Sequence, residues 1–273
     1  MKKDKLYNLL NQVRDDYIEN VQTELLERID LWKVDLKENE KYEVIGGLMA
    51  RQATLAIQFA TVHPIWNGHM APIVLRSMVD LYITLSWIFM DPLKRSQHFI
   101  AHGLGQEKLI LEHRKAQMEE DGIDTKNDEM IKAQESWINQ QRFTFLTEVD
   151  LGNWSKLGVY EMAVESGCKD LYNYAYTPFS TASHSMWNHI AKYNLDECIN
   201  PLHRFHRIPA IHPDPPHVHY FEVAAKYLDK VFKLFDDKTG IKVNAKSAYT
   251  TLISDLDKFS EENKEENDNE EAG

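Results

Sequence analysis

Ala71-Pro-Ile-Val-Leu-Arg-Ser-Met-Val-Asp-Leu-Tyr-Ile-Thr-Leu-Ser-Trp-Ile-Phe-Met90 is a largely apolar stretch that contains one arginine and one aspartate. Arg76 and Asp80 are four residues apart, so on a helix they share one face. An isolated buried charge is costly, so the two must pair, find other polar partners or line a wet cleft. The stretch therefore predicts a central, largely buried helix at about 69–90 that carries a polar centre.

Apolar residues recur at helical spacing on both sides of this stretch. The clearest runs are Leu6, Leu10, Val13 and Tyr17, and then Phe221, Ala225, Leu228, Phe232 and Phe235. Sustained two-residue alternation, the pattern of a half-buried strand, does not compete with this period. The chain is therefore predicted to be all-α, a multi-helix bundle. We expect helices at about 3–31, 40–62, 69–90, 92–119, 127–147, 154–166, 178–192, 217–236 and 245–260.

Prolines and polar runs predict several helix boundaries. Asp91-Pro92 places a capping residue before a proline at the first helical position, so one helix should end near Met90 and the next begin at once. Thr177-Pro178 predicts a second helix start of the same kind. The polar run 121–128 and the proline-rich run 209–216 are typical of loops.

The composition is that of an ordinary globular protein. The chain has 273 residues, 43% hydrophobic and 27% charged, which is enough to bury a sizeable core. No internal repeat or linker divides it, so we expect a single helical domain over 1–260. Cys168 and Cys198 fit no disulfide framework, and the N-terminus does not resemble a signal peptide, which favours the cytoplasm.

The net charge of −12 is concentrated at the C-terminus. Residues 261–273 hold seven of the 43 acidic residues and one of the 31 basic residues, which leaves the body at −6. This composition predicts an acidic, disordered tail. A body without a basic stripe argues against DNA as a partner. Arg76, Asp80 and an early Pro72 favour a helix buried in protein over a membrane span, so no membrane partner is expected.

A second polar group lies at the Thr177 boundary. Tyr176, Ser180 and His184 are spaced four apart, and Ser180 and His184 share a face of the predicted helix, continued by Trp187. Tyr176 is expected just outside the first turn. A serine near a helix start and a histidine on a mixed face are common in proteins without a site, so the spacing alone favours a structural role.

The two groups together resemble a known bacterial family. Leu75-Arg-Ser-Met-Val-Asp80, the leucine-rich and aromatic-rich continuation into Asp91-Pro92, and Tyr176-x3-Ser180-x3-His184 are similar to the helical family called domain of unknown function 5677. The resemblance covers roughly residues 45–235. It implies that Arg76, Asp80, Tyr176, Ser180 and His184 meet in one polar centre. The family brings no established activity.

One further motif resembles a nuclease signature. Arg95 and His102 have six residues between them, as in the Arg-x4-6-His motif of HEPN ribonucleases, small helical proteins of bacterial toxin and phage-defence systems. There a histidine would move the proton of the ribose 2′-hydroxyl and an arginine would stabilise charge on the phosphorane, without a metal. Arg207-x4-His212 also fits but contains Pro209. A solvated polar helix face is the favoured explanation for the spacing of Arg95 and His102.

The remaining histidines gather near the C-terminal third. His203, His206, His212, His217 and His219 lie in a proline-rich stretch, and such spacings are found in zinc sites. A second thiolate or a His-Glu-x-x-His motif does not accompany them. We therefore expect adventitious metal affinity, no functional metal and no cofactor, and leave the role of this cluster open.

Two functions of different classes remain. The first is a bacterial defence-type or toxin-type effector with metal-independent RNase activity, whose partners would be RNA and a second copy of the chain. Its candidate catalytic residues are Arg76, Asp80, Tyr176, Ser180, His184, Arg95 and His102. The second is a non-catalytic helical sensor or scaffold that binds a small anionic ligand or a protein partner, with Arg76 as anchor. The crowded histidines favour the first, and the acidic surface favours the second. The effector is the function that the sequence predicts, and the sensor or scaffold is the alternative.

Overall fold

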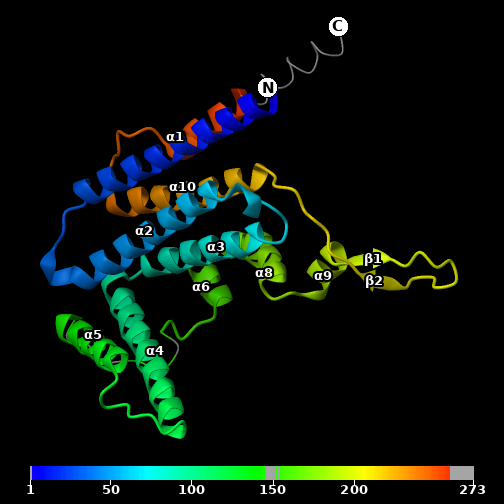
Figure 1. Ribbon diagram of the computed structural model, residues 1–273. Helices are drawn as coiled ribbons and strands as arrows, with labels where there is room; N and C mark the ends of the chain where they lie inside the picture. Colours follow the sequence, from blue (N-terminus) through cyan, green and yellow to red (C-terminus); the bar gives the residue numbers. More distant parts are fainter. Residues whose placement is uncertain (1, 146–149, 151, 153, 259–273) are drawn as a thin grey trace. The chain divides into compact units, whose positions relative to one another are not determined.

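The computed structural model describes residues 2–145, 150, 152 and 154–258, and it confirms the all-α prediction (Figure 1). The helices are α1 (Lys2–Leu31), η1 (Leu36–Glu38), α2 (Asn39–Thr61), η2 (His63–Ile65), α3 (Ala71–Ile88), α4 (Pro92–Glu120), α5 (Glu129–Phe145), α6 (Val159–Glu165), α7 (Lys169–Leu171), the π-helical turn η3 (Tyr172–Tyr176), α8 (Thr177–Ser183), α9 (Trp187–Tyr193) and α10 (His219–Thr239). A further helix covers 248–258. Strands β1 (Leu195–Glu197) and β2 (Arg207–Pro209) pair antiparallel, with Asp196 opposite Ile208.

The chain divides into two compact units. The first comprises the described parts of 1–33, 48–83 and 168–273, and the second comprises 34–47 and the described parts of 84–167. The boundaries fall inside α2 and α3, so both helices run through two units. The single domain predicted over 1–260 stays a prediction, and the predicted tail at 261–273 lies outside the described residues.

Helix α3 is buried, as the opening stretch predicts. Leu75, Met78, Val79, Ile83 and Ile88 have no exposed surface. Among the residues that the structure describes, α3 is the one helix long and apolar enough to cross a membrane, and 56% of it is buried inside the protein. That burial is typical of a core helix, in agreement with the interpretation of Arg76 and Asp80 as charges inside a folded protein.

The core of the first unit joins α2, α3 and α10 through a buried amide. Gln52 is fully buried, and its side-chain N–H groups donate to the carbonyls of Met78 (3.4 Å) and Tyr227 (3.2 Å). The ring of Trp66 stacks on Phe221 with centroids 4.8 Å apart. Because Gln52 would be costly to bury unpaired, its two bonds fix how these three helices pack.

A buried ionic group ties α1 to α10. Arg28 is 4% exposed and binds both carboxylate oxygens of Asp236, at 2.8 and 2.7 Å, while Glu24 lies 3.4 Å away on the preceding turn. The guanidinium also lies over the ring of Phe232, 4.3 Å from its centroid. Two carboxylates and a ring face therefore surround this arginine, the arrangement expected of a buried ion pair that holds two helices together.

The same face of α1 also holds the start of the last helix. Glu24 accepts the amide of Ala248 at 2.9 Å, and Glu27 accepts the amides of Asn244 (2.9 Å) and Ala245 (2.8 Å). These backbone bonds lower the pKa of Glu27, whereas burial raises the pKa of Glu24. Carboxylates from α1 thus bind the amides at the N-terminus of helix 248–258, where acidic groups are favourable.

One predicted helix start is wrong. The helix expected at 154–166 begins only at Val159, because a turn with Lys156 at φ 57° precedes it. Gly158 then donates its amide to the Glu161 carboxylate at the helix start. By contrast, α4 begins at Pro92 after Asp91 as predicted, although the Asp91 side chain makes no capping bond.

The helix expected at 178–192 is interrupted. Ser185 adopts φ 48°, its amide donates to the carbonyl of Ala182 (3.2 Å), and the amide of Met186 donates to the carbonyl of Thr181 (2.9 Å). This pair of bonds is a Schellman motif, which ends α8 before α9 begins. The motif usually uses glycine at the left-handed position, so the serine gave no signal in the sequence.

Candidate functional site

The polar centre of the first unit is built around Arg76 on α3. Its Nε donates to Ser180 Oγ at 2.9 Å, and its Nη2 donates to the hydroxyl of Tyr176. The guanidinium also lies over the ring of Tyr176, 4.4 Å from the centroid. The structure therefore brings together three of the residues singled out from the sequence, about a hundred positions apart in the chain.

The π-helical turn places Tyr176. Thr177 does not start a helix as predicted, because the helical path runs on from α7 through η3 into α8. Pro178 has no N–H to donate to the carbonyl one turn earlier, and the chain accommodates it with a wider turn. Tyr176 consequently lies inside the helical path, buried, with its ring stacked on Tyr172 at 4.9 Å.

The hydroxyl protons of Ser180 and Tyr176 differ in whether they already have an acceptor. Ser180 Oγ donates its proton to the carbonyl of Tyr176 at 2.7 Å. The hydroxyl of Tyr176 accepts from Arg76, and its own proton has no acceptor among the described residues. Burial raises the pKa of Tyr176, so the group stays a neutral donor. Arg76 Nη1 likewise has no partner in the described part of the chain and is not enclosed.

Asp80 lies beside this centre without joining it by a hydrogen bond. Its carboxylate is half-buried, and among the described residues no ion pair with Arg76 is formed. Burial raises the pKa of Asp80, and the nearby positive charge of Arg76 opposes that rise only in part. Asp80 and Arg76 therefore influence each other electrostatically, but the buried pair that their spacing suggested is absent.

His184 is not part of the centre. It is the C-cap residue that follows α8, it is exposed, and its side chain makes no hydrogen bond or ion pair among the residues the structure describes. The face that Ser180 was expected to share with His184 and Trp187 ends at this turn, and Trp187 begins α9 with 70% of its surface exposed. Because α8 ends at Ser183, nine residues before the predicted end at 192, the shared face is lost.

The second unit contains the other candidate pair, and Arg95 is already engaged there. It donates to the carbonyl of Trp87 (2.6 Å), lies 3.6 Å from the centroid of the Trp87 ring and forms an ion pair with Glu165 at 3.6 Å. The indole N–H of Trp87 donates to the same carboxylate at 2.7 Å. Trp87, Arg95 and Glu165 therefore form a closed group that joins α3, α4 and α6.

His102 lies two turns further along α4 and is half-buried. Its Nδ1 is enclosed and has no hydrogen-bond partner among the described residues. The backbone of Asp150 approaches α4 here: its amide donates to the carbonyl of Ala101 at 2.9 Å, and a Cβ at Gly105 would collide with its carbonyl. Gly105 is explained by this close approach of a loop.

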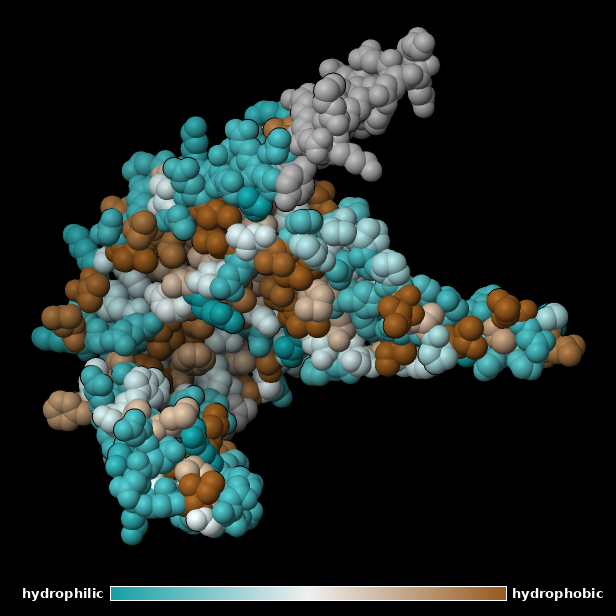
Figure 2. All heavy atoms as spheres, viewed as in Figure 1, coloured by the Kyte–Doolittle hydropathy of each residue, from teal (hydrophilic) through white to brown (hydrophobic). Residues whose placement is uncertain are grey.

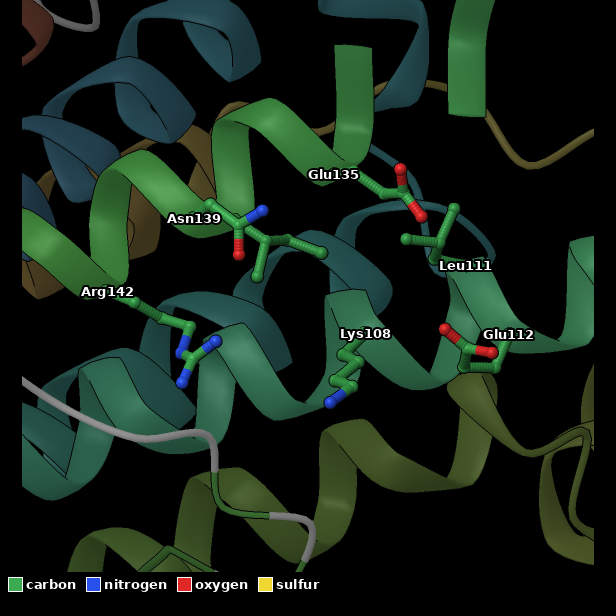
Figure 3. Close-up of a pocket in the computed structure, with 7 residues that line it drawn as sticks. Lys108, Leu111, Glu112, Glu135, Asn139 and Arg142 are labelled. Atoms are coloured by element: carbon green, nitrogen blue, oxygen red, sulfur yellow. The ribbon is translucent and has the colours of Figure 1, made fainter. Parts of the chain in front are cut away.

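A pocket between α4 and α5 was not anticipated from the sequence. Lys108 and Glu112 of α4 and Glu135, Asn139 and Arg142 of α5 line it, around the apolar Leu111 and Ile138 (Figure 3). Lys115 binds both glutamates, at 3.2 and 2.7 Å, so the acidic side of the pocket is neutralised by an ion-pair group. The charged residues of the two helices are visible in the sequence. Which residues of α4 lie opposite which residues of α5 depends on how the helices pack, and the sequence pattern does not give that alignment.

Comparison with known proteins assigns the chain to a family, and that family has no known activity. No curated protein and no solved structure matches the chain. The model of a family of unknown function, DUF5677, matches residues 42–199, a span that includes Arg76, Asp80, Tyr176 and Ser180 and covers more than half of the chain. The resemblance drawn from Arg-x3-Asp and Tyr-x3-Ser-x3-His is thereby confirmed: the chain belongs to the family of unknown function DUF5677.

Proposed function

We propose that the chain is a helical sensor or scaffold that binds a small anionic ligand, such as a phosphate or carboxylate group, at the centre formed by Arg76, Tyr176 and Ser180. One observation supports this above all. Arg76 is half-buried and held by two neutral hydroxyls, and no carboxylate of the described residues forms an ion pair with it. Its positive charge is therefore held by neutral groups, with Asp80 acting on it only electrostatically and without an ion pair.

The donors of the centre suit an anion. Arg76 Nη1 and the proton of the Tyr176 hydroxyl are both uncommitted among the described residues, and the hydroxyl is fixed by its bond to Nη2. A charged and a neutral donor held together are a common way to bind a phosphate or carboxylate oxygen. Asp80 opposes such a ligand while it is ionised. Because its pKa is already raised, we expect binding to be accompanied by proton uptake at Asp80.

Inorganic phosphate is the first probe. We expect it to raise the melting temperature of the full-length protein in a concentration-dependent way, and more strongly as the pH is lowered and Asp80 becomes protonated. Arg76→Gln should abolish the response. Arg51→Gln, an exposed arginine of α2 in the same unit, is the matched control and should respond like the wild type. An equal response of Arg76→Gln would disprove the proposed site.

The RNase hypothesis is the second candidate. It is favoured by Nδ1 of His102, which is enclosed and has no hydrogen-bond partner in the part of the chain that the structure describes. A histidine with an unsatisfied nitrogen two turns from an arginine on one helix has the elements of a proton-transfer pair. The engagement of Arg95 by Trp87 and Glu165 weighs against it, since a catalytic arginine must reach the phosphate. Arg95 would have to leave this group before it could act.

This candidate has its own test. Purified protein should cleave single-stranded RNA in the presence of EDTA, and its expression should slow bacterial growth. His102→Ala should abolish both effects, while His98→Ala, an exposed histidine one turn earlier on α4, should leave them intact. His184→Ala tests the other histidine in the same assay. RNA left intact by the wild type, with no growth effect, would exclude this activity.

A further inference from the structure

The loop between β1 and β2 gathers a cysteine and two histidines. Cys198 follows β1 directly, and His203 and His206 lie just before β2. The amide of Cys198 donates to the carbonyl of His206 at 3.0 Å, and the amide of His206 donates to the carbonyl of His203 at 3.0 Å. These backbone bonds fold the loop so that one sulfur and two imidazole nitrogens lie within 4.8 Å of one another.

We propose that Cys198, His203 and His206 bind a zinc ion, with the fourth position open to water or an external ligand. The sulfur of Cys198 lies 3.6 Å from Nδ1 of His203. Zinc–sulfur and zinc–nitrogen bonds of about 2.3 and 2.0 Å at a tetrahedral angle require the two ligand atoms to be about 3.6 Å apart. The loop therefore already holds this edge of the tetrahedron, and His206 needs only a small movement to complete the site.

The ligand chemistry selects the metal. One thiolate and two imidazoles suit zinc, whereas Mg²⁺ and Ca²⁺ prefer oxygen ligands. The amide nitrogen Nδ2 of Asn200 lies 3.3 Å from Nε2 of His203, on the side of the ring away from the sulfur. Zinc bound through Nδ1 requires the proton on Nε2, so the Asn200 amide group would have to turn away or present its oxygen when the metal binds.

Burial of apolar side chains contributes little to the stability of the loop. Ile199, Leu202 and Phe205 are 96%, 88% and 93% exposed, so no apolar core holds the loop. Figure 2 shows such hydrophobic side chains along the hairpin, in brown among hydrophilic ones. Phe205 is at φ 68°, a strained backbone for a bulky residue, between the two histidines. A hairpin with strands of three residues is marginal alone, and a bound metal would stabilise its fold.

Metal binding by the full-length protein tests the proposal. After EDTA treatment and desalting, the protein should take up one zinc ion per chain, measured by mass spectrometry of the metal content. Cobalt in place of zinc should give a thiolate-to-cobalt charge-transfer band. Cys198→Ser should abolish that band, and both Cys198→Ser and His206→Ala should weaken zinc affinity at least about tenfold, measured against a competing chelator.

Matched variants keep the result specific to the loop. Cys168→Ser removes the other cysteine, and His212→Ala removes a neighbouring histidine that pairs with Asp196; both should bind zinc like the wild type. Zinc should also slow hydrogen exchange of the Cys198 and His206 amides. The proposal is overturned if the wild type binds no zinc, or if Cys198→Ser and His206→Ala bind it as tightly as their controls.

Discussion

Arg28 and Arg76 lie in the same compact unit but differ in the groups that hold them. Arg28 is buried between two carboxylates, with Asp236 bound through both oxygens and Glu24 one turn away. Arg76 is half-buried and bound by the hydroxyls of Tyr176 and Ser180. An arginine whose charge is fully paired holds helices together, whereas one held by hydroxyls keeps its charge for another partner.

The largest effect is expected at Arg28. Replacement by alanine leaves Asp236 and Glu24 without their cation, so the free energy of unfolding should fall by about 3 to 5 kcal/mol. Urea denaturation followed by circular dichroism measures this loss. Arg51→Ala is the control and should change stability by no more than about 0.5 kcal/mol. If Arg28→Ala behaves like the control, the ion pair does not hold α1 to α10.

A smaller loss is expected at Arg76. Alanine there removes two hydrogen bonds to neutral groups and strands no partner carboxylate, so stability should fall by about 1 to 2 kcal/mol. The same denaturation measurement applies. The contrast with Arg28 fails if Arg76→Ala is the more destabilising of the two, because Arg76 would then be the stronger structural lock.

Asp80→Asn should act in the opposite direction. Because the pKa of Asp80 is raised in the folded state, its contribution to stability is fully present below its unfolded pKa and declines as the pH rises through the folded value. Asparagine removes that decline, so the variant should be more stable than the wild type at neutral pH, by about 1 kcal/mol or less. Its response to phosphate should be stronger. Denaturation at several pH values measures this. The prediction is contradicted if the free energies of unfolding of the wild type and the variant depend on pH in the same way.

The smallest effect is expected at His184. Its exposed side chain makes no hydrogen bond or ion pair among the described residues, so alanine should leave stability within about 0.5 kcal/mol of the wild type and the phosphate response unchanged. Thermal denaturation with and without phosphate measures both. If His184→Ala no longer responds to phosphate, His184 belongs to the centre around Arg76.

Some of the candidate site followed from local pattern, and some did not. Arg76 stood out because a charge inside an apolar helix needs a partner, and that reasoning does not depend on the rest of the fold. The spacing left Asp80 as one possible partner beside other polar groups, and the structure gives Tyr176 and Ser180, two of the residues that the family resemblance implied. The spacing rule assumes that near neighbours on a helix face pair, but a hydroxyl from another helix can be closer than a carboxylate one turn away.

The sequence by itself determined the helical class, the buried α3 and the start of α4 at Pro92, because apolar periodicity and proline act over a few residues. Only the tertiary structure decided that Arg28 binds Asp236, that a turn at Ser185 follows the end of α8, and that Cys198 lies beside two histidines. Such contacts depend on how distant segments of the chain pack together. They also depend on left-handed backbone turns that non-glycine residues adopt only when the surrounding structure holds them, and the local spacing of residues predicts neither.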